Sequence, residues 1–287
     1  MASLLDLPDF MFKDESKTFN KFEKVFFTIY GLIVGFVYKR TEGKLFCFFM
    51  NLFFNKDGKI SFEKNLYSKK IWTDFNFYYP NKRIDRIIIN HKKHFKRLYL
   101  SYCLDVVNFD QKDLIIDCGA NVGELFMSLK LKVDDFRYIG YEPDPAAFNS
   151  LKINLSSYNA EIHDLALSNI NDKKPLYLNT EGADSSLIYF GSDDSAMVSC
   201  KTLDSYEYKK IKLLKIEAEG GELEVLEGSV NTLKNVEFVS VDYGPERGEN
   251  KDSTSVGIIN FLYKNNFKLV NVSKYRQIGL FKNNLFK

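Results

Sequence analysis

The fold of this chain is decided by the stretch Asp117-Cys118-Gly119-Ala120-Asn121-Val122-Gly123-Glu124. The stretch overlaps the end of a short apolar run at residues 114–117, and apolar side chains at helical spacing come after it. Its two glycines let the backbone turn tightly and approach a bound ligand, and the start of the helix offers unpaired backbone N–H groups. The pattern therefore predicts a strand, a ligand-binding turn and a helix.

The positions of the glycines indicate which nucleotide this turn binds. A dinucleotide-binding turn has the pattern GxGxxG, but Asn121 and Glu124 stand where its second and third glycines would be. The sequence therefore disfavours NAD. Asp117, at the end of the strand, can accept a hydrogen bond from the amino group of a ligand or order the turn.

Residues after the second and third predicted strands complete a site for an adenosine. Glu142 follows the run at residues 138–141, 19 residues after Gly123, where a carboxylate can hold both ribose hydroxyls. Pro143 ends that strand, and two residues at the end of the third strand are expected to border the adenine. The predicted cofactor-binding residues are Asp117, Gly119, Ala120, Asn121, Gly123, Glu124, Glu142, Pro143, Asp164 and Ala166.

Short apolar runs alternate with helical patterns from residue 110 onward, which is typical of a parallel sheet covered by helices. A polar hairpin that includes residues 176–178 interrupts the series, and the runs at residues 268–272 and 277–281 predict an antiparallel pair. The sequence therefore predicts an α/β fold with a doubly wound, mostly parallel sheet and an antiparallel C-terminal strand pair. The predicted parallel strands are residues 114–117, 138–141, 160–164, 212–216 and 238–241.

Five segments resemble, in order, the motifs of the FkbM-type S-adenosylmethionine-dependent methyltransferases. They are residues 117–124, 141–143, 166–168, 202–204 and 215–222. The resemblance covers roughly residues 95–280 and implies a Rossmann-like class I methyltransferase fold with S-adenosylmethionine as cofactor. It also implies O-methylation of an alcohol, often a sugar hydroxyl of a surface polysaccharide or a hydroxyl of a secondary metabolite.

The most specific of these segments is Lys-Ile-Glu-Ala-Glu-Gly-Gly-Glu at residues 215–222. It departs from the family pattern at two positions, since the family has Asp where this chain has Glu217 and Ala where it has Gly221. The longer acid keeps the negative charge but moves it by about one methylene group.

Methyl transfer to an alcohol requires that the hydroxyl lose its proton, and charged residues at the ends of the fourth and fifth strands are the candidates. Glu217 can act as general base, with Lys215 orienting the acceptor or stabilising the developing alkoxide. Alternatively, Glu217 or Glu219 together with Asp242 holds a magnesium ion that acidifies the hydroxyl. A third interpretation is that Lys215 and Glu217 form an ion pair that closes the end of the strand.

Further candidates lie nearby in the sequence. His163, within the third predicted strand, is either a catalytic base or a structural histidine. Residues 184–186 can bring hydroxyl donors over the methionine end of the cofactor, or form an ordinary polar turn. The loop at residues 244–250, with Glu246 and Arg247, is a candidate contact for the acceptor.

A change of composition near residue 100 predicts two domains, an N-terminal extension at residues 1–95 and a methyltransferase domain at residues 96–287. Two aromatic-rich apolar stretches in the extension, residues 25–38 and 45–54, predict a helical hairpin. The hairpin is expected to pack as core or to form a homodimer surface. The alternative is that its phenylalanines dip into a membrane beside basic residues. These are Phe46, Phe48, Phe49, Phe53 and Phe54.

Residues 81–98 hold seven Lys and Arg residues offset by Asp85 alone. This basic segment is either a solvated helix face or a surface that attracts an anionic acceptor or anionic lipid. The uncharged run at residues 25–38 spans only about 21 Å as a helix, which is short of the roughly 30 Å hydrocarbon core of a membrane. A spanning helix is therefore not expected.

Composition excludes several classes of protein. The formal net charge of +2 gives no reason to expect a nucleic-acid partner. The four cysteines show no CxxC pair, which speaks against a disulfide framework or a zinc site. Residues 1–14 do not read as a secretory signal. We therefore predict a cytoplasmic protein, with peripheral contact at the inner face of the membrane as the alternative.

The leading functional hypothesis is an S-adenosylmethionine-dependent O-methyltransferase that acts on a hydroxyl of a sugar in a surface polysaccharide or another glycan. A secondary metabolite or a lipid is the alternative acceptor. A nicotinamide-dependent dehydrogenase or epimerase is a competing class, against which the glycine pattern speaks. The remaining class is a non-catalytic nucleotide-binding or interaction protein on the same fold.

Overall fold

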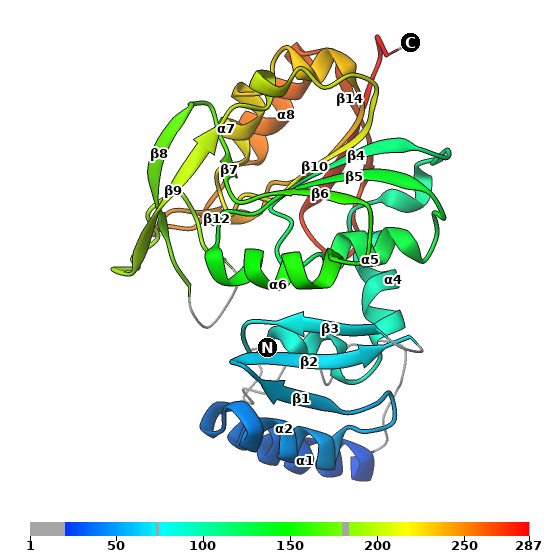
Figure 1. Ribbon diagram of the computed structural model, residues 1–287, viewed down its shortest axis with the longest axis vertical. Coiled ribbons are helices and arrows are strands. Elements are labelled where there is room, and N and C mark those ends of the chain that lie inside the picture. The colour runs from blue at the N-terminus through cyan, green and yellow to red at the C-terminus, as the bar shows by residue number, and fades with distance from the viewer. Residues whose placement is uncertain (1–20, 73–74, 180–183, 287) are drawn as a thin grey trace. The chain divides into compact units, whose positions relative to one another are not determined.

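The computed structural model describes residues 21–72, 75–179 and 184–286 (Figure 1). The chain forms two compact units, an N-terminal unit of residues 1–94 and a C-terminal unit of residues 95–287. Among the described residues, no helix combines the length and the apolar character needed to cross a membrane.

The N-terminal unit begins with the predicted helical hairpin, formed by α1 (Lys21–Arg40) and α2 (Gly43–Phe53). An antiparallel sheet follows, with β1 (Ile60–Glu63), β2 (Leu66–Ile71) and β3 (Phe75–Tyr79) in that order. The short helices η2 (Lys82–Ile84) and α3 (Asp85–Ile88) come next, and α4 (His91–Ser101) crosses the boundary between the units. The extension was predicted to be helical, but it also contains this three-stranded sheet.

The sheet of the N-terminal unit was not predicted from the sequence, because its central strand contains a buried lysine. The side chain of Lys69 in β2 is fully buried, where a lysine normally indicates a surface position. Its ammonium donates to Asp57 at 2.7 Å and to the carbonyl oxygens of Ile87 and Ile88 at 2.6 and 2.8 Å. These partners replace the lost water, and they cannot be recognised from the local pattern of the strand.

The C-terminal unit contains the predicted central sheet, with the strand order β14-β15-β11-β10-β4-β5-β6. Neighbouring strands from β11 to β6 are parallel, and β15 is antiparallel to β11 and β14. The doubly wound, mostly parallel fold with an antiparallel C-terminal pair is thus confirmed. The strands are β4 (Asp113–Cys118), β5 (Phe136–Tyr141), β6 (Ala160–His163), β10 (Ile211–Ile216), β11 (Val236–Asp242), β14 (Phe267–Val272) and β15 (Ile278–Asn283).

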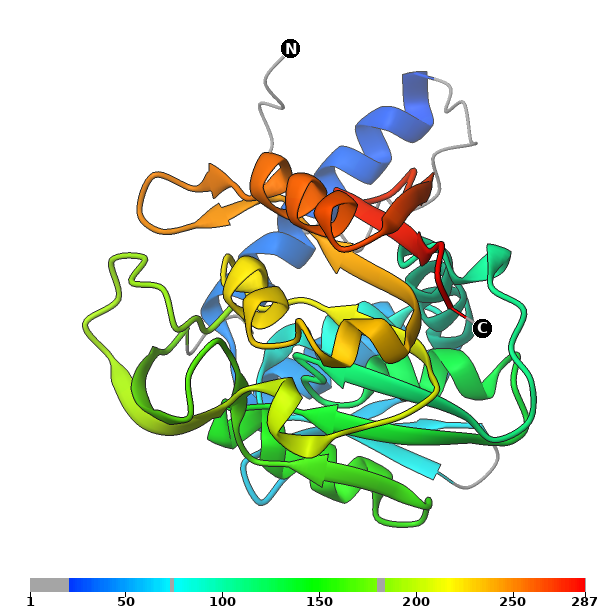
Figure 2. The same cartoon turned by 90° about the horizontal axis from the view of Figure 1, so that it is seen from above.

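Helices cover both faces of this sheet, with α5 and α6 on one face and α7 and α8 on the other (Figure 1, Figure 2). Phe126 of α5 packs edge-on against Tyr138 of β5, and Ile258 of α8 belongs to the core cluster that contains Ile116 of β4. Coverage of both faces explains why β4 reads as a continuous apolar run. The bounds are α5 (Glu124–Lys130), α6 (Pro145–Leu155), α7 (Glu222–Glu227) and α8 (Ser255–Lys264), with short helices η3 (Leu104–Val106), η4 (Leu203–Tyr206) and η5 (Thr232–Asn235).

Two small sheets are attached to the C-terminal unit. The first has the order β7-β9-β8, formed by β7 (Ala166–Leu167), β8 (Asp172–Tyr177) and β9 (Ser195–Lys201). The predicted hairpin at residues 176–178 therefore belongs to β8 and pairs with β9, a strand that the sequence analysis did not predict. The second is a hairpin of β12 (Pro245–Arg247) and β13 (Asp252–Ser253).

Candidate active site

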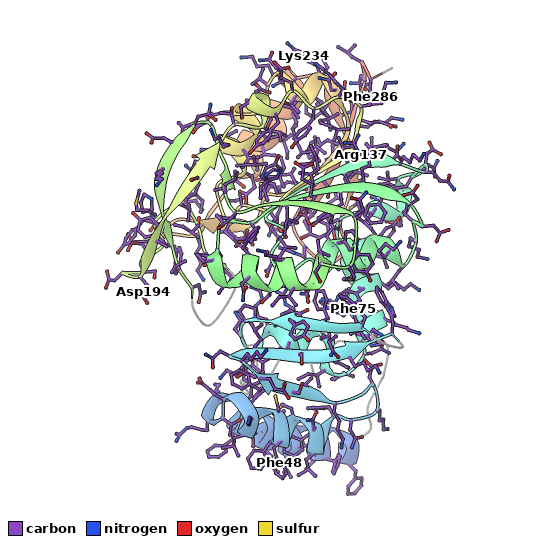
Figure 3. The ribbon with its side chains drawn as sticks, in the orientation of Figure 1. Phe48, Phe75, Arg137, Asp194, Lys234 and Phe286 are labelled. Carbon is purple, nitrogen blue, oxygen red and sulfur yellow. The ribbon has the colours of Figure 1, made fainter. Side chains whose placement is uncertain are left out.

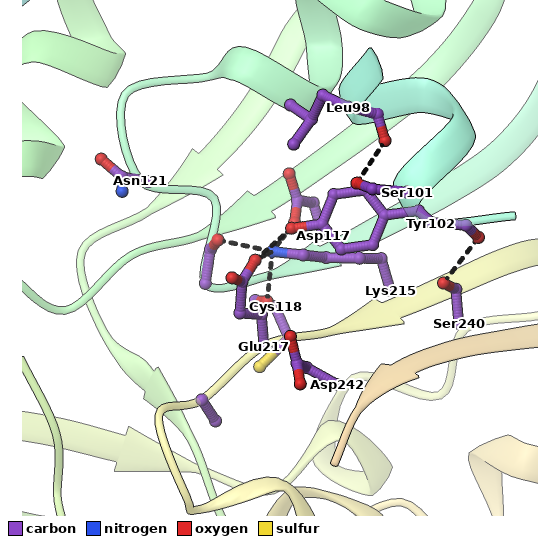
Figure 4. Close-up of polar contacts among 12 residues, drawn as sticks. Leu98, Ser101, Tyr102, Asp117, Cys118, Asn121, Lys215, Glu217, Ser240 and Asp242 are labelled. Carbon is purple, nitrogen blue, oxygen red and sulfur yellow. Dashed lines mark hydrogen bonds and ion pairs between the residues drawn. The ribbon is translucent and has the colours of Figure 1, made fainter. Parts of the chain in front are cut away.

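The candidate site lies where the two central strands, β4 and β10, end side by side. From β4 the chain continues to β5 on one side, and from β10 it continues to β11 on the other. Such a reversal of strand order opens a crevice beyond the carboxyl ends of the strands, which is the usual ligand site of open α/β sheets. Lys215 of β10 stands in register with Asp117 of β4, and their Nζ and Oδ1 atoms are 2.9 Å apart (Figure 4).

The ammonium of Lys215 is held entirely by the protein. It donates to the carbonyl oxygens of Cys118 and Gly119 at 3.1 and 2.7 Å, and it lies 3.3 Å from Glu217 Oε2. Burial alone would lower the pKa of Lys215, but the charges of Asp117 and its other neighbours outweigh that effect and raise the pKa well above its ordinary value. The side chain of Lys215 is only 2% exposed. Its contacts therefore indicate a structural ion pair that fixes the glycine turn, and not a residue that binds the acceptor directly.

The carboxylate of Glu217 is surrounded by donors. It accepts hydrogen bonds from the hydroxyl of Tyr102 and from the guanidinium of Arg276, besides its ion pair with Lys215. Burial would raise the pKa of Glu217, but the positive charges of Arg276 and Lys215 and these hydrogen bonds hold it far below its usual range. A carboxylate stabilised in this way is a poor general base, because it gains little by accepting a proton.

Arg276 occupies the position between the two carboxylates that the sequence analysis considered for a metal ion. Its Nη2 donates to Glu217 and, at 2.7 Å, to Asp242 Oδ2, while Asp242 Oδ1 accepts from the backbone N–H of Gly244. No group of three His, Cys, Asp or Glu residues suited to a metal ion is found among the residues that the structure describes. Glu217 and Asp242 therefore form a carboxylate pair around a guanidinium, which does not fit a magnesium ion at this place.

Tyr102 and Arg276 were not among the residues singled out in the sequence. The phenol ring of Tyr102 lies 5.4 Å from Lys215 Nζ, and the carbonyl oxygen of Tyr102 accepts a hydrogen bond from Ser240 of β11 at 2.9 Å. Arg276 lies between β14 and β15, 59 residues after Glu217. Neither residue belongs to a local motif, so only the folded chain brings them to the site.

The glycine turn after β4 is shaped by the protein itself. Gly119 has a φ of +76°, and a Cβ atom there would overlap the carbonyl oxygen of Glu217. The N–H groups of Gly119 and Ala120 both donate to the carbonyl oxygen of Tyr141, at 3.0 and 2.9 Å. Gly119 is thus required because the end of β10 packs directly on it. This contact adds to the tight turn and the approach of a ligand that the sequence predicted.

Glu142 lies beside this turn at the end of β5. Its Oε2 accepts from the N–H of Asn121 at 2.7 Å, and its Oε1 accepts from the N–H of Asp144 at 2.8 Å. Burial raises the pKa of Glu142 to about 7, although these two hydrogen bonds act in the opposite direction. Each carboxylate oxygen keeps a further lone pair, so the group fits two donor hydroxyls of a ribose.

The segment after residue 183 links the two sides of the site. The hydroxyl of Ser185 donates to Asp144 Oδ2 at 2.8 Å, and the hydroxyl of Ser186 donates to the carbonyl oxygen of Glu219 at 2.7 Å. The two serines therefore tie the start of α6 to the loop between β10 and α7. Both hydroxyls have protein partners here, so this segment positions the loop rather than offering spare donors.

Two further carboxylates, Glu219 and Glu246, form what we call the acid pair. The loop that carries Glu219 contacts β12, the strand that carries Glu246, because a Cβ atom on Gly220 would lie 2.7 Å from the Cα atom of Arg247. Burial, then the charges of Glu217, Glu246 and Asp184, raise the pKa of Glu219 well above its ordinary value. Burial and the neighbouring carboxylates likewise raise the pKa of Glu246 to about 8. The acid pair thus holds protons at neutral pH more tightly than free carboxylates do.

The structure does not bring every predicted residue to this cluster. His163 is in register with Tyr141 and stacks on its ring at 4.8 Å. Through Tyr141 it is also in register with Cys118, the residue after Asp117, so its side chain lies on the opposite face of the sheet. Its Nε2 is 2.7 Å from Glu161 Oε1, which suits a structural histidine.

The remaining predicted cofactor residues differ in their surroundings. Glu124 is the first residue of α5 and is buried, and Pro143 directly follows Glu142. Asp164 is exposed after β6, and Ala166 belongs to the core of the small β7-β9-β8 sheet. Their predicted contacts with a cofactor stay predictions.

Two known proteins that are similar to this chain in sequence are named as methyltransferases. "Methyltransferase 1" of Beauveria bassiana (strain ARSEF 2860) is 24% identical over 161 residues, which are 46% of this chain and 65% of that protein. "Methyltransferase sdnD" of Sordaria araneosa is 26% identical over 190 residues, which are 53% of this chain and 71% of that protein. A crystal structure of methyltransferase FkbM from Methylobacillus flagellatus KT matches with 13% identity and a TM-score of 0.46, over 67% of this chain and 50% of that one. The chain thus spans about two thirds of the first relative and half of the solved structure.

The family model described as Methyltransferase FkbM domain matches residues 117–269. The match begins at Asp117, the buried partner of Lys215, and takes in the glycine turn, Glu142, the acid pair and Asp242. It covers more than half of the chain, and it agrees with the doubly wound sheet and with the site at the ends of β4 and β10. The chain belongs to the FkbM methyltransferase domain family.

Proposed function

We propose that this protein is an S-adenosylmethionine-dependent O-methyltransferase that uses the acid pair, Glu219 and Glu246, to take up the proton of an acceptor hydroxyl. The observation that carries the proposal is the position of this pair. Glu219 follows Glu217 by two residues beyond the end of β10, and the neighbouring Gly220 packs against Arg247 of β12, the strand that carries Glu246. Glu217 in turn packs on the glycine turn through its carbonyl oxygen. A proton acceptor and a nucleotide-binding turn are therefore neighbours.

The turn at residues 117–124 and Glu142 are the groups that would hold the cofactor. When bound, S-adenosylmethionine supplies a methyl carbon on a positively charged sulfur that is open to in-line displacement. Glu142 would accept the two ribose hydroxyls on its free lone pairs. Its own contacts with Asn121 and Asp144 keep the carboxylate aimed beside the turn, so that little ordering is needed on binding.

The acid pair would act on the acceptor. The ionised member of the pair would take up the proton of the acceptor hydroxyl while that oxygen is methylated by the bound cofactor. Neighbouring carboxylates in a partly buried place resist holding two negative charges, which makes them better proton acceptors than Glu217. A hydroxyl is a weak nucleophile until a base removes its proton, whereas a neutral amine can attack through its lone pair without such a base. A base beside the cofactor turn therefore favours oxygen over an amine as the methylated atom.

Lys215, Glu217 and Arg276 would position these groups. Lys215 binds the two carbonyl oxygens of the glycine turn, and Glu217 is fixed by Tyr102 and Arg276. A rigid arrangement matters because displacement at carbon requires the three reacting atoms to lie nearly in line. We assign these residues to alignment rather than to proton transfer.

The acceptor that we favour is a sugar hydroxyl of a surface polysaccharide or another glycan. The support for it is the membership of the FkbM methyltransferase domain family, together with the two partly buried carboxylates of the acid pair, Glu219 and Glu246. Carboxylates accept hydrogen bonds from the many hydroxyls of a sugar. Secondary metabolites and lipids remain acceptors to be tested beside glycans, and the proposed place of the reaction is the cytoplasm.

The test is transfer of a labelled methyl group from S-adenosylmethionine to the polysaccharide, lipid and small-molecule fractions of the producing cells. We expect the wild-type protein to label one fraction and Glu219→Gln to lower turnover by about 100-fold or more, with unchanged calorimetric affinity for the cofactor. The matched control is Glu249→Gln, an exposed acid in the same loop as Glu246, which should leave turnover unchanged.

Each half of the proposal can fail separately. Absence of cofactor binding by calorimetry would disprove the cofactor assignment. Tight binding without labelling of any fraction would favour a non-catalytic protein on this fold. If labelling persists at the wild-type rate in the double variant Glu219→Gln/Glu246→Gln, the acid pair is not the base.

A further inference from the structure

The helical hairpin of the N-terminal unit carries a continuous row of large, exposed apolar side chains, which we call the apolar face. Their exposed fractions range from 48% for Leu32 to 89% for Phe22. The members on α1 are Phe22, Val25, Phe26, Ile29, Leu32, Ile33 and Phe36, and those on α2 are Leu45, Phe48 and Leu52. Scattered apolar residues are common on protein surfaces, but a contiguous row of this size indicates a binding surface.

The row follows the helical repeat. On α1 its members recur at intervals of three or four residues from Phe22 to Phe36, so they form one stripe about 21 Å long. On α2, Leu45, Phe48 and Leu52 have the same spacing, and Phe48 points away from the three-stranded sheet (Figure 3). Both helices are therefore amphipathic, with the apolar stripe turned outward.

The opposite sides of the helices hold the hairpin on the rest of the N-terminal unit. Val34, Phe46 and Met50 are fully buried. Asn51 of α2 exchanges two hydrogen bonds, of 2.7 and 2.8 Å, with the backbone of Ile60 in β1. The unit thus has its own core without the apolar face, and its folding does not explain why ten large apolar side chains are exposed.

Charge distinguishes between the possible occupants of this face. Residues 1–94 contain 17 Lys and Arg against ten Asp and Glu, a net charge of +7, whereas residues 95–287 contain 23 against 28, a net charge of −5. Exposed cations also lie at the turn of the hairpin, where Arg40 and Lys44 flank the apolar face. The guanidinium of Arg40 lies 5.5 Å from the centre of the Phe36 ring.

We propose that the apolar face docks on a membrane surface that is rich in anionic lipid, with α1 and α2 lying in the plane of the membrane. Amphipathic helices with aromatic and aliphatic residues on one side and Lys or Arg at the rim bind in this way. Anionic headgroups attract the net positive N-terminal unit, and the apolar side chains enter the boundary of the acyl chains. A second copy of the chain fits less well, since a twofold contact brings two units of charge +7 together.

Flotation of the full chain with vesicles tests this proposal. We expect binding to vesicles of phosphatidylcholine and phosphatidylglycerol that is at least about tenfold stronger than to phosphatidylcholine alone, and that weakens as salt is raised. The variant Phe22→Gln/Phe36→Gln/Phe48→Gln should lower binding about tenfold or more, because it removes three inserted rings. Arg40→Gln/Lys44→Gln should lower binding only to the anionic vesicles.

A matched control separates the apolar face from exposed apolar surface in general. The variant Met197→Gln/Val256→Gln/Tyr263→Gln replaces three side chains of the C-terminal unit with exposed fractions of 64, 72 and 57%. It should bind vesicles as the wild-type chain does. Glutamine has a high helix propensity, so the helices are expected to persist in each variant. Circular dichroism verifies this.

Three outcomes would overturn the proposal. The first is a wild-type chain that binds neither kind of vesicle, and the second is unchanged binding by the triple phenylalanine variant. The third is a homodimer in sedimentation equilibrium that the triple phenylalanine variant converts to a monomer, without vesicle binding by either protein. That last result would assign the face to a second copy of this chain.

Discussion

Asp117 and Lys215 form a buried ion pair across the two central strands, with 0 and 2% of their side chains exposed. The pair joins the strand before the glycine turn to the strand before the loop that carries Glu217 and Glu219. Because the same ammonium also binds the carbonyl oxygens of Cys118 and Gly119, one side chain fixes the geometry of both loops. The ion pair therefore couples the proposed cofactor side of the site to its acceptor side.

Replacing Lys215 by Met should destabilise the protein strongly. It leaves the fully buried Asp117 without its cationic partner, and loss of one member of a buried pair costs about 3–5 kcal/mol. Urea denaturation measures this loss. Lys201→Met, at an exposed position of β9, is the control and should change the free energy of unfolding by less than about 0.5 kcal/mol. Equal effects of the two changes would contradict the structural role of Lys215.

Gly119→Ala should be more harmful than the same change at another glycine of positive φ. At Gly191, with a φ of +94°, a Cβ atom would meet only Glu249 Oε1 at 3.7 Å, so the expected cost is the conformational strain of about 1–2 kcal/mol. At Gly119 the Cβ atom would also overlap the carbonyl oxygen of Glu217, and we expect a loss above about 3 kcal/mol. Thermal unfolding of the two variants compares them directly, and similar melting temperatures would argue against the close approach.

Glu142→Gln should weaken binding of S-adenosylmethionine by about 1.5–3 kcal/mol, the usual contribution of hydrogen bonds to a charged group. Isothermal titration calorimetry measures the change. Glu161→Gln on β6, which removes a largely exposed carboxylate, serves as the control. An unchanged affinity for Glu142→Gln would remove this residue from the cofactor site.

The pKa of Glu142, raised to about 7 by burial, adds a pH dependence to the same measurement. Only the ionised carboxylate can accept two hydroxyls, so cofactor affinity should rise as pH passes through about 7 and then level off. The effect on stability has the opposite sign. The folded state holds the proton more tightly than the unfolded state, so this group's contribution to stability falls as pH rises from about 4.5 to 7.

Turnover should depend on the protonation of the acid pair. With the pKa of Glu246 at about 8 and that of Glu219 raised as well, kcat/KM should increase with pH and level off above about 8. Glu246→Gln removes a carboxylate that raises the pKa of Glu219, so the rising limb should move to lower pH. A pH profile that is identical in wild type and Glu246→Gln would contradict the coupling, and Glu249→Gln should leave the profile in place.

Chelation should not reduce turnover. Arg276 already supplies a positive charge between Glu217 and Asp242, so we expect equal rates of methyl transfer with EDTA and with added magnesium. Loss of activity in EDTA that magnesium restores would show that these carboxylates bind a metal ion after all.

Arg276→Gln should lower turnover by disordering Glu217, and rescue by Arg276→Lys would indicate that charge matters more than the two-pronged geometry of the guanidinium.

The strands of the parallel sheet, the glycine turn, and the positions of Glu142 and the charged residues at the strand ends could be predicted from the sequence alone. These features follow from local signals. A continuous apolar run indicates a strand that is covered on both faces, and a glycine in a turn indicates a backbone conformation that other residues avoid. The antiparallel pair β14 and β15 was likewise visible as two runs separated by a short polar turn.

The roles of the charged residues depend on contacts that form only in the folded chain. Tyr102 is separated from Glu217 by 115 residues, and Arg276 from Glu217 by 59. Contacts over such distances in the chain cannot be predicted from a local motif. Those contacts lower the pKa of Glu217 and occupy the place considered for a metal ion, which moves the proposed base to Glu219 and Glu246. Strand β2 was missed for the same reason. The sequence shows that Lys69 is charged, but it does not show the partners that allow this charge to be buried.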